Sequence, residues 1–212
     1  MTAARGIIFS LDDVLVQTGE IHRSAWLTVA ERAGIPITSA DAGRLSGLTR
    51  ERSARTLLES SGAPVSPAEL EVLAAEKNHT YRRLVRGLTP DDVAPGAGQL
   101  LIELRARGLR LAVCSGSRNA KYILERVGLR GLFDAISDGE NVTRLKPDPE
   151  VFSRAAEFLA LEARDCLVVE GSAAGVEAAH LGGFRCYGFG EAADHPRVTA
   201  RLDRLSDILA HL

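Results

Sequence analysis

Short apolar runs alternate with stretches of helical spacing through most of this chain, and this alternation constrains the fold most. Strands are predicted over 7–9, 109–114, 135–137, 166–169 and 184–189. Helices are predicted in the second half over 95–107, 119–127, 149–159, 173–181 and 200–212. Strands joined through helices can lie parallel to one another. The pattern therefore predicts an α/β fold, with a Rossmann-like parallel sheet wound with helices on both faces.

A purely helical stretch separates the first strand from the others. Helical spacing covers 20–33, 50–60 and 66–84, and this block carries no strand signal. Its third helix has a clear start, with Ser66 as N-cap, proline next, and Glu69 three residues after the cap. We therefore expect an α/β core formed by 1–17 and 90–212, with an all-helical insertion over 18–89.

Composition and charge exclude several classes of partner. The chain has 212 residues, 45% of them hydrophobic, and a net charge of −2, so no basic field suggests a nucleic acid. No apolar run approaches the roughly 20 residues that span a bilayer. The first strand begins within a few residues and leaves no room for a signal peptide, so a cytoplasmic location is expected. The three cysteines lie in or beside apolar runs and are expected in the core, not in disulfides.

Polar residues follow the ends of the predicted strands. The first strand ends at Ser10, with Asp12 and Asp13 directly after it. In an open parallel sheet, ligands bind beyond the carboxyl ends of the strands, so these side chains are candidates for chemistry. The alternative is a strand that stops at a polar turn, with one aspartate capping the next segment of the chain.

Three later strand ends and loops carry similar signals. Ser115 to Asn119 lie at a helix start, where exposed N–H groups, a hydroxyl and the positive helix end suit a phosphate oxygen, although Ser115 could be an ordinary N-cap. Lys146 could pair with carboxylates or a phosphoryl group, or be a solvated loop charge. Glu170 could serve a metal, accept a hydrogen bond or cap a helix.

The segment Phe9 to Thr18 resembles the first motif of the haloacid dehalogenase superfamily, most closely of its β-phosphoglucomutase branch. That motif usually reads Phe-Asp-x-Asp-Gly-Val-Leu-x-Asp-Thr, and here it reads FSLDDVLVQT. The resemblance implies a nucleophilic aspartate where this chain has Ser10, and an acid/base aspartate where it has Asp12. Asp13 stands where glycine is usual, and Gln17 where aspartate is usual.

The other motifs of the superfamily are matched in order by Ser115, Lys146 and Glu170, but Gly171 stands where the fourth motif has an aspartate. The resemblance implies Mg²⁺ bound by the first aspartate, the backbone carbonyl of the second, and the fourth-motif aspartate. Both carboxylate ligands are thus replaced, at Ser10 and Gly171, and we expect no metal to be required. Asp12, Asp13 and Glu170 are the remaining candidate ligands.

The helical insertion resembles the cap of β-phosphoglucomutases. The resemblance implies that His22 helps to shuttle a proton, that Arg50 grips a distal phosphate and that Lys77 contacts the substrate. Structural alternatives are a helix-surface histidine, a first-turn charge and a solvated helix lysine. Further phosphate contacts are implied for three residues of the loop after the second core strand: Gly116, Ser117 and Asn119.

Three functions are consistent with these residues. The first is binding of a phosphorylated sugar or similar small anion with Mg²⁺-dependent phosphoryl transfer lost, because a serine hydroxyl is a weak nucleophile without a base. The second is a metal-independent isomerase, lyase or hydrolase that uses Asp12, His22, Lys146 or Glu170 as acid or base. The third is an active phosphatase or mutase with a site rebuilt on Asp13 and Glu170.

Overall fold

The computed structural model describes residues 4–45, 49–60, 62 and 65–212. The chain divides into two compact units, Met1–Gln17 with Thr89–Leu212, and Thr18–Leu88. The first unit holds all of the strands found in the described residues, and the second is helical. Each unit buries a hydrophobic cluster of its own.

The first unit is built on a parallel sheet, as the alternating sequence pattern predicts. In the described part of the chain the sheet has six strands in the order β3-β2-β1-β4-β5-β6, and every neighbouring pair is parallel. The strands are β1 Gly6–Ser10, β2 Arg110–Cys114, β3 Ala135–Ser137, β4 Cys166–Glu170, β5 Arg185–Phe189 and β6 Ala200–Leu202. This order places β1 between β2 and β4, so their carboxyl ends meet at one edge.

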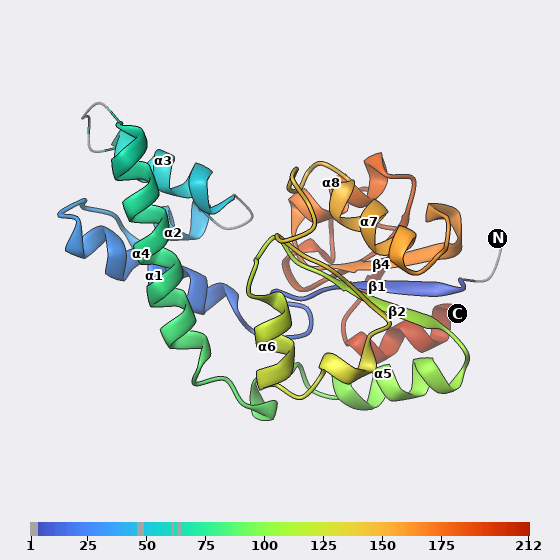
Figure 1. The fold of residues 1–212 in the computed structure, drawn as a ribbon. Coiled ribbons are helices and arrows are strands. Elements are labelled where there is room, and N and C mark those ends of the chain that lie inside the picture. Colours follow the sequence, from blue (N-terminus) through green and yellow to red (C-terminus); the bar gives the residue numbers. More distant parts are fainter. Residues whose placement is uncertain (1–3, 46–48, 61, 63–64) are drawn as a thin grey trace. The chain divides into compact units, whose positions relative to one another are not determined.

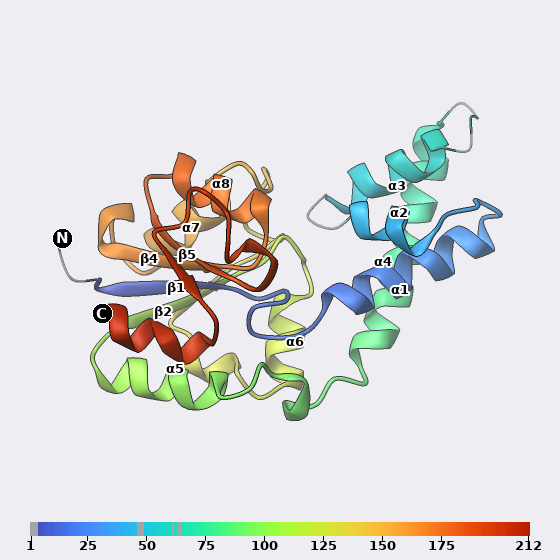
Figure 2. The same cartoon turned by 180° about the vertical axis from the view of Figure 1, so that it is seen from behind.

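Helices cover both faces of this sheet. On one face lie α7 and α8, and on the other lies α5 with the C-terminal segment beside it (Figures 1 and 2). The α-helices of this unit are α5 Ala97–Ala106, α6 Ala120–Arg126, α7 Glu150–Phe158 and α8 Ala173–Leu181. Short 3-10 helices are η1 Pro90–Asp92, η2 Arg130–Leu132, η3 Ala163–Asp165, η4 Gly190–Ala192 and η5 Leu205–His211.

The inner strands β1, β2 and β4 are apolar along most of their length because both faces of the sheet are covered. Side chains alternate between the faces, and Ile8, Ala112 and Val168 belong to one buried cluster with Phe152 of α7 and Val176 of α8. The predicted burial of the three cysteines is confirmed, and all three are free.

The prediction of a terminal helix over 200–212 is wrong in its first part. Residues Ala200–Leu202 form β6, which pairs with β5 at the sheet edge. Asp207 then accepts the backbone N–H groups of Asp203 and Arg204, at 3.1 and 2.8 Å. This local capping begins η5 at Leu205. The helix cannot start earlier because residues 200–202 are paired with β5 in the sheet.

The second unit contains α1 Gly19–Arg32, α2 Ser39–Arg44, α3 Arg50–Ser60 and α4 Pro67–Val85. The predicted start of α4 is confirmed: Ser66 Oγ accepts the Glu69 N–H, and the Glu69 carboxylate accepts the Ser66 N–H. The short helix α2 was not predicted. Among the described residues, no helix is both long and apolar enough to cross a membrane.

Candidate functional site

Ser10 and Glu170 end two neighbouring strands at the same level of the sheet. The register pairs Phe9 with Val169, so the next residue on each strand is the last one before the edge. By the alternation of side chains, both project to the face that α7 covers, as Ile8 and Val168 do. This geometry explains why a loop leading into α7 can reach both residues.

Lys146, in that loop, joins the two strand ends. Its Nζ donates to Ser10 Oγ at 3.1 Å and forms an ion pair with Glu170. The side chains of Lys146 and Glu170 are only 14% and 1% exposed. The Lys146 ammonium also lies 5.1 Å from the centroid of the Phe152 ring. The predicted alternative of a solvated loop lysine is therefore wrong.

The partners hold each other in the charged state. Burial favours the neutral forms of both side chains, yet attraction to Glu170 raises the pKa of Lys146 above its usual value. Burial likewise acts to raise the pKa of Glu170, but Lys146 and the hydroxyls of Ser10 and Ser172 lower it overall. At neutral pH, Lys146 is an ammonium and Glu170 is a carboxylate.

Glu170 is also fixed from the side of α8. Its Oε2 accepts both the N–H and the hydroxyl of Ser172, each at 2.8 Å. Gly175, in the first turn of α8, leaves room for the carboxylate, because a Cβ at that position would lie 2.0 Å from Glu170 Cδ. Ser172 in turn caps α8 by accepting the Gly175 N–H.

Asp12 forms a second contact across the strand ends. Ser115 Oγ donates to Asp12 Oδ2 at 2.7 Å and accepts the Ser117 N–H at 3.1 Å. Ser117 Oγ accepts the Asn119 N–H at 3.1 Å. The prediction of exposed N–H groups is thus wrong for Ser117 and Asn119, because the loop's own hydroxyls bind them. Ser115 is also not the N-cap of α6, which begins at Ala120.

Two further predicted site residues of this region, Gly116 and Asp13, are exposed. Gly116 is exposed, and a Cβ there would meet Leu145 at 3.1 Å, so the glycine allows the Lys146 loop to approach. Asp13 is exposed and has a φ of 58°, in the left-handed region. The structure brings together Ser10, Asp12, Ser115, Lys146 and Glu170 at the strand ends.

Glu150 was missed by the sequence analysis. Its carboxylate accepts the N–H groups of Thr143 and Arg144, at 3.0 and 2.8 Å, and so shapes the loop that carries Lys146. The hydrogen bonds from the backbone of Thr143 and Arg144 lower the pKa of Glu150 to about 2. The signal available in the sequence was an acid in the first turn of a predicted helix.

In the helical unit, His22 and Lys77 lie together. Lys77 Nζ is 2.7 Å from His22 Nδ1, and the His22 ring stacks on Tyr81 with centroids 4.0 Å apart. The Lys77 ammonium also faces the rings of Tyr81 and Trp26, at 4.5 and 5.3 Å from their centroids. Lys77 is 5% exposed, so the alternative of a solvated helix lysine is wrong.

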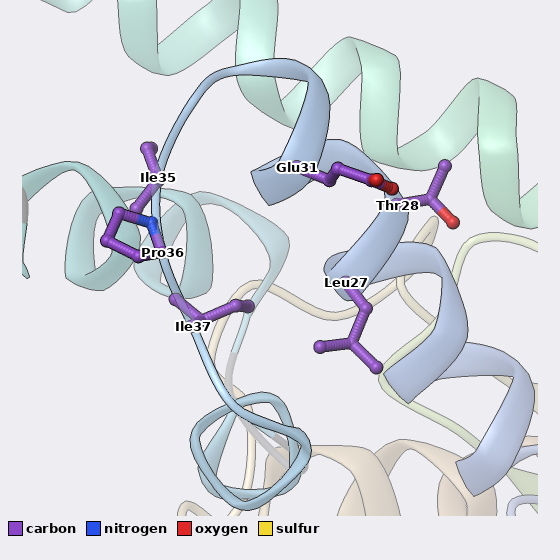
Figure 3. Close-up of a pocket in the computed structure, with 6 residues that line it drawn as sticks. All are labelled: Leu27, Thr28, Glu31, Ile35, Pro36 and Ile37. Atoms are coloured by element: carbon purple, nitrogen blue, oxygen red, sulfur yellow. The ribbon is translucent and has the colours of Figure 1, made fainter.

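Arg50 is the first residue of α3, and residues 46–48 before it lie outside the described part of the chain. A cavity of about 400 Å³ in the same unit is lined by α1 and the segment after it (Figure 3). Its lining residues are Leu27, Thr28, Glu31, Ile35, Pro36 and Ile37. None of the predicted site residues lines this cavity.

The residues at the strand ends do not fit the divalent cation that the motifs imply. Ser10 Oγ and one Glu170 oxygen face the Lys146 ammonium, and the other Glu170 oxygen is bound by Ser172. Gly171 supplies no side-chain donor. Within residues 4–45, 49–60, 62 and 65–212, no three His, Cys, Asp or Glu side chains are grouped as a metal site.

The fold and the motifs at its strand ends define a family. Residues 4–183 match the model of the haloacid dehalogenase-like hydrolases, and the chain belongs to this family. Within it, the chain is β-phosphoglucomutase-like, and it is 36% identical over 189 residues to the β-phosphoglucomutase of Bacillus subtilis (strain 168), covering 88% of this chain and 84% of that one.

Two further proteins are similar. The crystal structure of β-phosphoglucomutase from Clostridium difficile superposes with a TM-score of 0.90 at 28% identity, covering 98% of this chain and 96% of that one. A phosphorylated carbohydrates phosphatase of Thermotoga maritima is 30% identical over 191 residues, covering 86% of this chain and 83% of that protein. The resemblance stated from the motifs is therefore confirmed.

Proposed function

We propose that this protein binds a small phosphorylated metabolite, such as a sugar phosphate, at the carboxyl ends of β1, β2 and β4. We further propose that phosphoryl transfer through an aspartyl nucleophile and Mg²⁺ has been lost. The names of the relatives from Bacillus subtilis and Thermotoga maritima support the substrate class, since both denote enzymes of phosphorylated sugars.

The surroundings of Ser10 carry this proposal. A serine attacks phosphorus only when a neighbouring group accepts its proton. Lys146, which contacts Ser10 Oγ, already holds its own proton firmly, because the pairing with Glu170 raises its pKa. The pKa of Glu170 is lowered, which makes this carboxylate a poor base. Neither neighbour can activate the hydroxyl.

Binding of an anion is supported by groups that remain. Lys146 offers a fixed ammonium at the strand ends, and the Ser115 hydroxyl lies within the same cluster through Asp12. In the helical unit we propose that Arg50 and Lys77 contact the ligand and that the unit acts as a cap. We also propose that the amides of Ser117 and Asn119 contact the phosphate. In that state a ligand oxygen takes the place of the hydroxyl that binds each amide in the structure.

Thermal unfolding with a panel of sugar monophosphates tests the proposal, with the matching unphosphorylated sugars as controls. A ligand at 100 times its Kd stabilises the folded state by about 2.7 kcal/mol, which corresponds to a rise in Tm of several degrees for a chain of this size. We expect such a rise for at least one phosphate, with no release of inorganic phosphate. No rise with any phosphate, or Mg²⁺-dependent turnover with a phosphorylated Ser10, would contradict the proposal.

A second candidate is acid/base catalysis without a metal. It is favoured by Asp12, which is only partly buried and is held at 2.7 Å by the Ser115 hydroxyl. Under this function, turnover of a sugar phosphate would persist in a chelator and disappear in Asp12→Asn. Turnover that a chelator abolishes would count against it.

A further inference from the structure

The two departures that fall on metal-ligand positions, Ser10 and Gly171, are matched in charge by the ion they would bind. Ser10 and Gly171 each stand where the resemblance implies a carboxylate that binds a divalent cation. Removing two carboxylates together with one doubly charged ion leaves the net charge of the site unchanged. The remaining acid on β4, Glu170, is neutralised by an ammonium of this chain.

We propose that the Lys146 ammonium, seated between Ser10 and Glu170, is the built-in cation of this site, so that phosphate binds there without a divalent ion. The inference rests on the proposed function, since it concerns how the same site holds its anion. It goes further by naming Lys146, a residue that the family motifs share, as the cation that suffices for the anion, and by making binding independent of Mg²⁺.

The contacts of Lys146 are those expected of a fixed cation. Its ammonium has one neutral oxygen ligand, Ser10 Oγ at 3.1 Å, one charged ligand, Glu170, and an aromatic face, Phe152, at 5.1 Å. A serine at position 10 suits this arrangement, because a hydroxyl accepts from the ammonium without adding a second negative charge. The loop itself is held by Glu150, so the ammonium is placed before any ligand arrives.

A divalent ion has no comparable place. To bind Glu170 it would displace Lys146 from a carboxylate that is 1% exposed, and it would then face the released ammonium at close range. A Cβ at position 171 would lie 3.1 Å from Val14 Cγ2, and the next nearest atoms are the backbone oxygens of Asp13 and Phe189, at 3.6 and 3.8 Å, so no carboxylate is among these nearest atoms. Gly171 itself therefore offers a divalent ion no side-chain oxygen.

The test measures the affinity for inorganic phosphate by titration calorimetry, in a chelator and in millimolar Mg²⁺. We expect the wild-type affinity to be the same in both within about twofold. The Ser10→Asp/Gly171→Asp variant restores the two carboxylates, and Ser10→Asn/Gly171→Asn is its matched neutral control. We expect the aspartate variant to bind phosphate about tenfold more weakly than the asparagine variant in the chelator, because like charges then face the anion, and to recover in Mg²⁺.

A second pair isolates the ammonium. Lys146→Gln combined with Glu170→Gln removes both charges while nearly keeping the side-chain volumes, and its melting curve shows whether it folds. We expect phosphate affinity to fall by about tenfold or more, with no recovery in Mg²⁺. Should this variant misfold, the comparison of the aspartate and asparagine variants decides.

The outcomes separate this inference from the proposed function. Wild-type protein that binds phosphate only in Mg²⁺ overturns the inference and leaves the proposed function standing. Equal phosphate affinity of the aspartate and asparagine variants in the chelator also overturns it. Wild-type protein that binds neither phosphate nor any sugar phosphate in either buffer overturns both.

Discussion

Gly175 gives the sharpest test of how Glu170 is held, because the structure decides the sign of the effect. Alanine is the better helix former, so Gly175→Ala in the first turn of α8 would by itself stabilise the protein by up to about 1 kcal/mol. The added Cβ, however, would lie 2.0, 2.1 and 2.5 Å from Cδ, Oε2 and Oε1 of Glu170. Since unstrained carbon contacts lie near 3.5 Å, the carboxylate must move by about 1.5 Å.

That movement breaks contacts with charged partners. The Glu170 oxygens accept from Ser172 and pair with Lys146, and a hydrogen bond to a charged group contributes about 1.5–3 kcal/mol. Losing one such contact outweighs the gain in helix propensity. We therefore expect Gly175→Ala to lower the free energy of unfolding by about 0.5–2 kcal/mol, as the difference of these two effects.

The assay is urea unfolding, with Gly98→Ala as the matched control. Gly98 also lies in the first turn of a helix, α5, and a Cβ there meets only Leu129 Cδ2 at 3.9 Å. We expect the control to be neutral or stabilising by up to about 1 kcal/mol. If Gly175→Ala stabilises the protein as much as Gly98→Ala does, the reasoning about the Glu170 carboxylate is refuted.

Three further changes have defined outcomes. Glu150→Gln should weaken the loop before α7. Because the pKa of Glu150 is lowered from 4.5 to about 2 in the folded state, the ionised carboxylate stabilises the protein above about pH 4.5, and this stabilisation fades as the pH falls toward 2. The unfolding curves of wild type and variant should therefore converge near pH 2. Ser66→Ala removes the N-cap of α4 and should lower stability by about 1 kcal/mol in urea unfolding, whereas Ser60→Ala, near the end of α3, should have less effect. Lys77→Met keeps the apolar stem but loses the contact with His22 and the aromatic rings, and we expect about 1–2 kcal/mol of destabilisation; an unchanged stability would show that these contacts contribute nothing net.

The sequence predicted the fold because its signals are local and strong. Apolar runs such as Ile7 to Phe9 indicate strands buried on both faces, and the Ser66 to Glu69 pattern indicates a helix start. The helix prediction for the start of the C-terminal segment was wrong because pairing with β5 is a long-range contact, and residues 200–202 carry no strand signal of their own.

For the candidate site, the sequence pointed to residues that lie together in the structure, but not to the contacts between them. Ser10, Lys146 and Glu170 were each found at a strand end or in a loop, where the sequence left their roles open. Their pairing depends on the order of the strands, which puts β1 beside β4, and on the side-chain alternation that turns both strand ends toward α7. Close approaches such as that of Gly175 to Glu170 arise only when the chain is folded.

The replacements at positions 10 and 171 are best understood as one change. A carboxylate restored at one position alone adds a negative charge beside Glu170, which already shares the single ammonium of Lys146. Two carboxylates restored together give a divalent ion enough oxygen ligands to compete with that ammonium. We therefore expect a double-mutant cycle of Ser10→Asp and Gly171→Asp to be strongly non-additive in the affinity for Mg²⁺, each single variant gaining little and the double variant more than both combined. An additive cycle would mean that the two positions act independently, and it would contradict the proposal that the two replaced carboxylates and the divalent ion belong together.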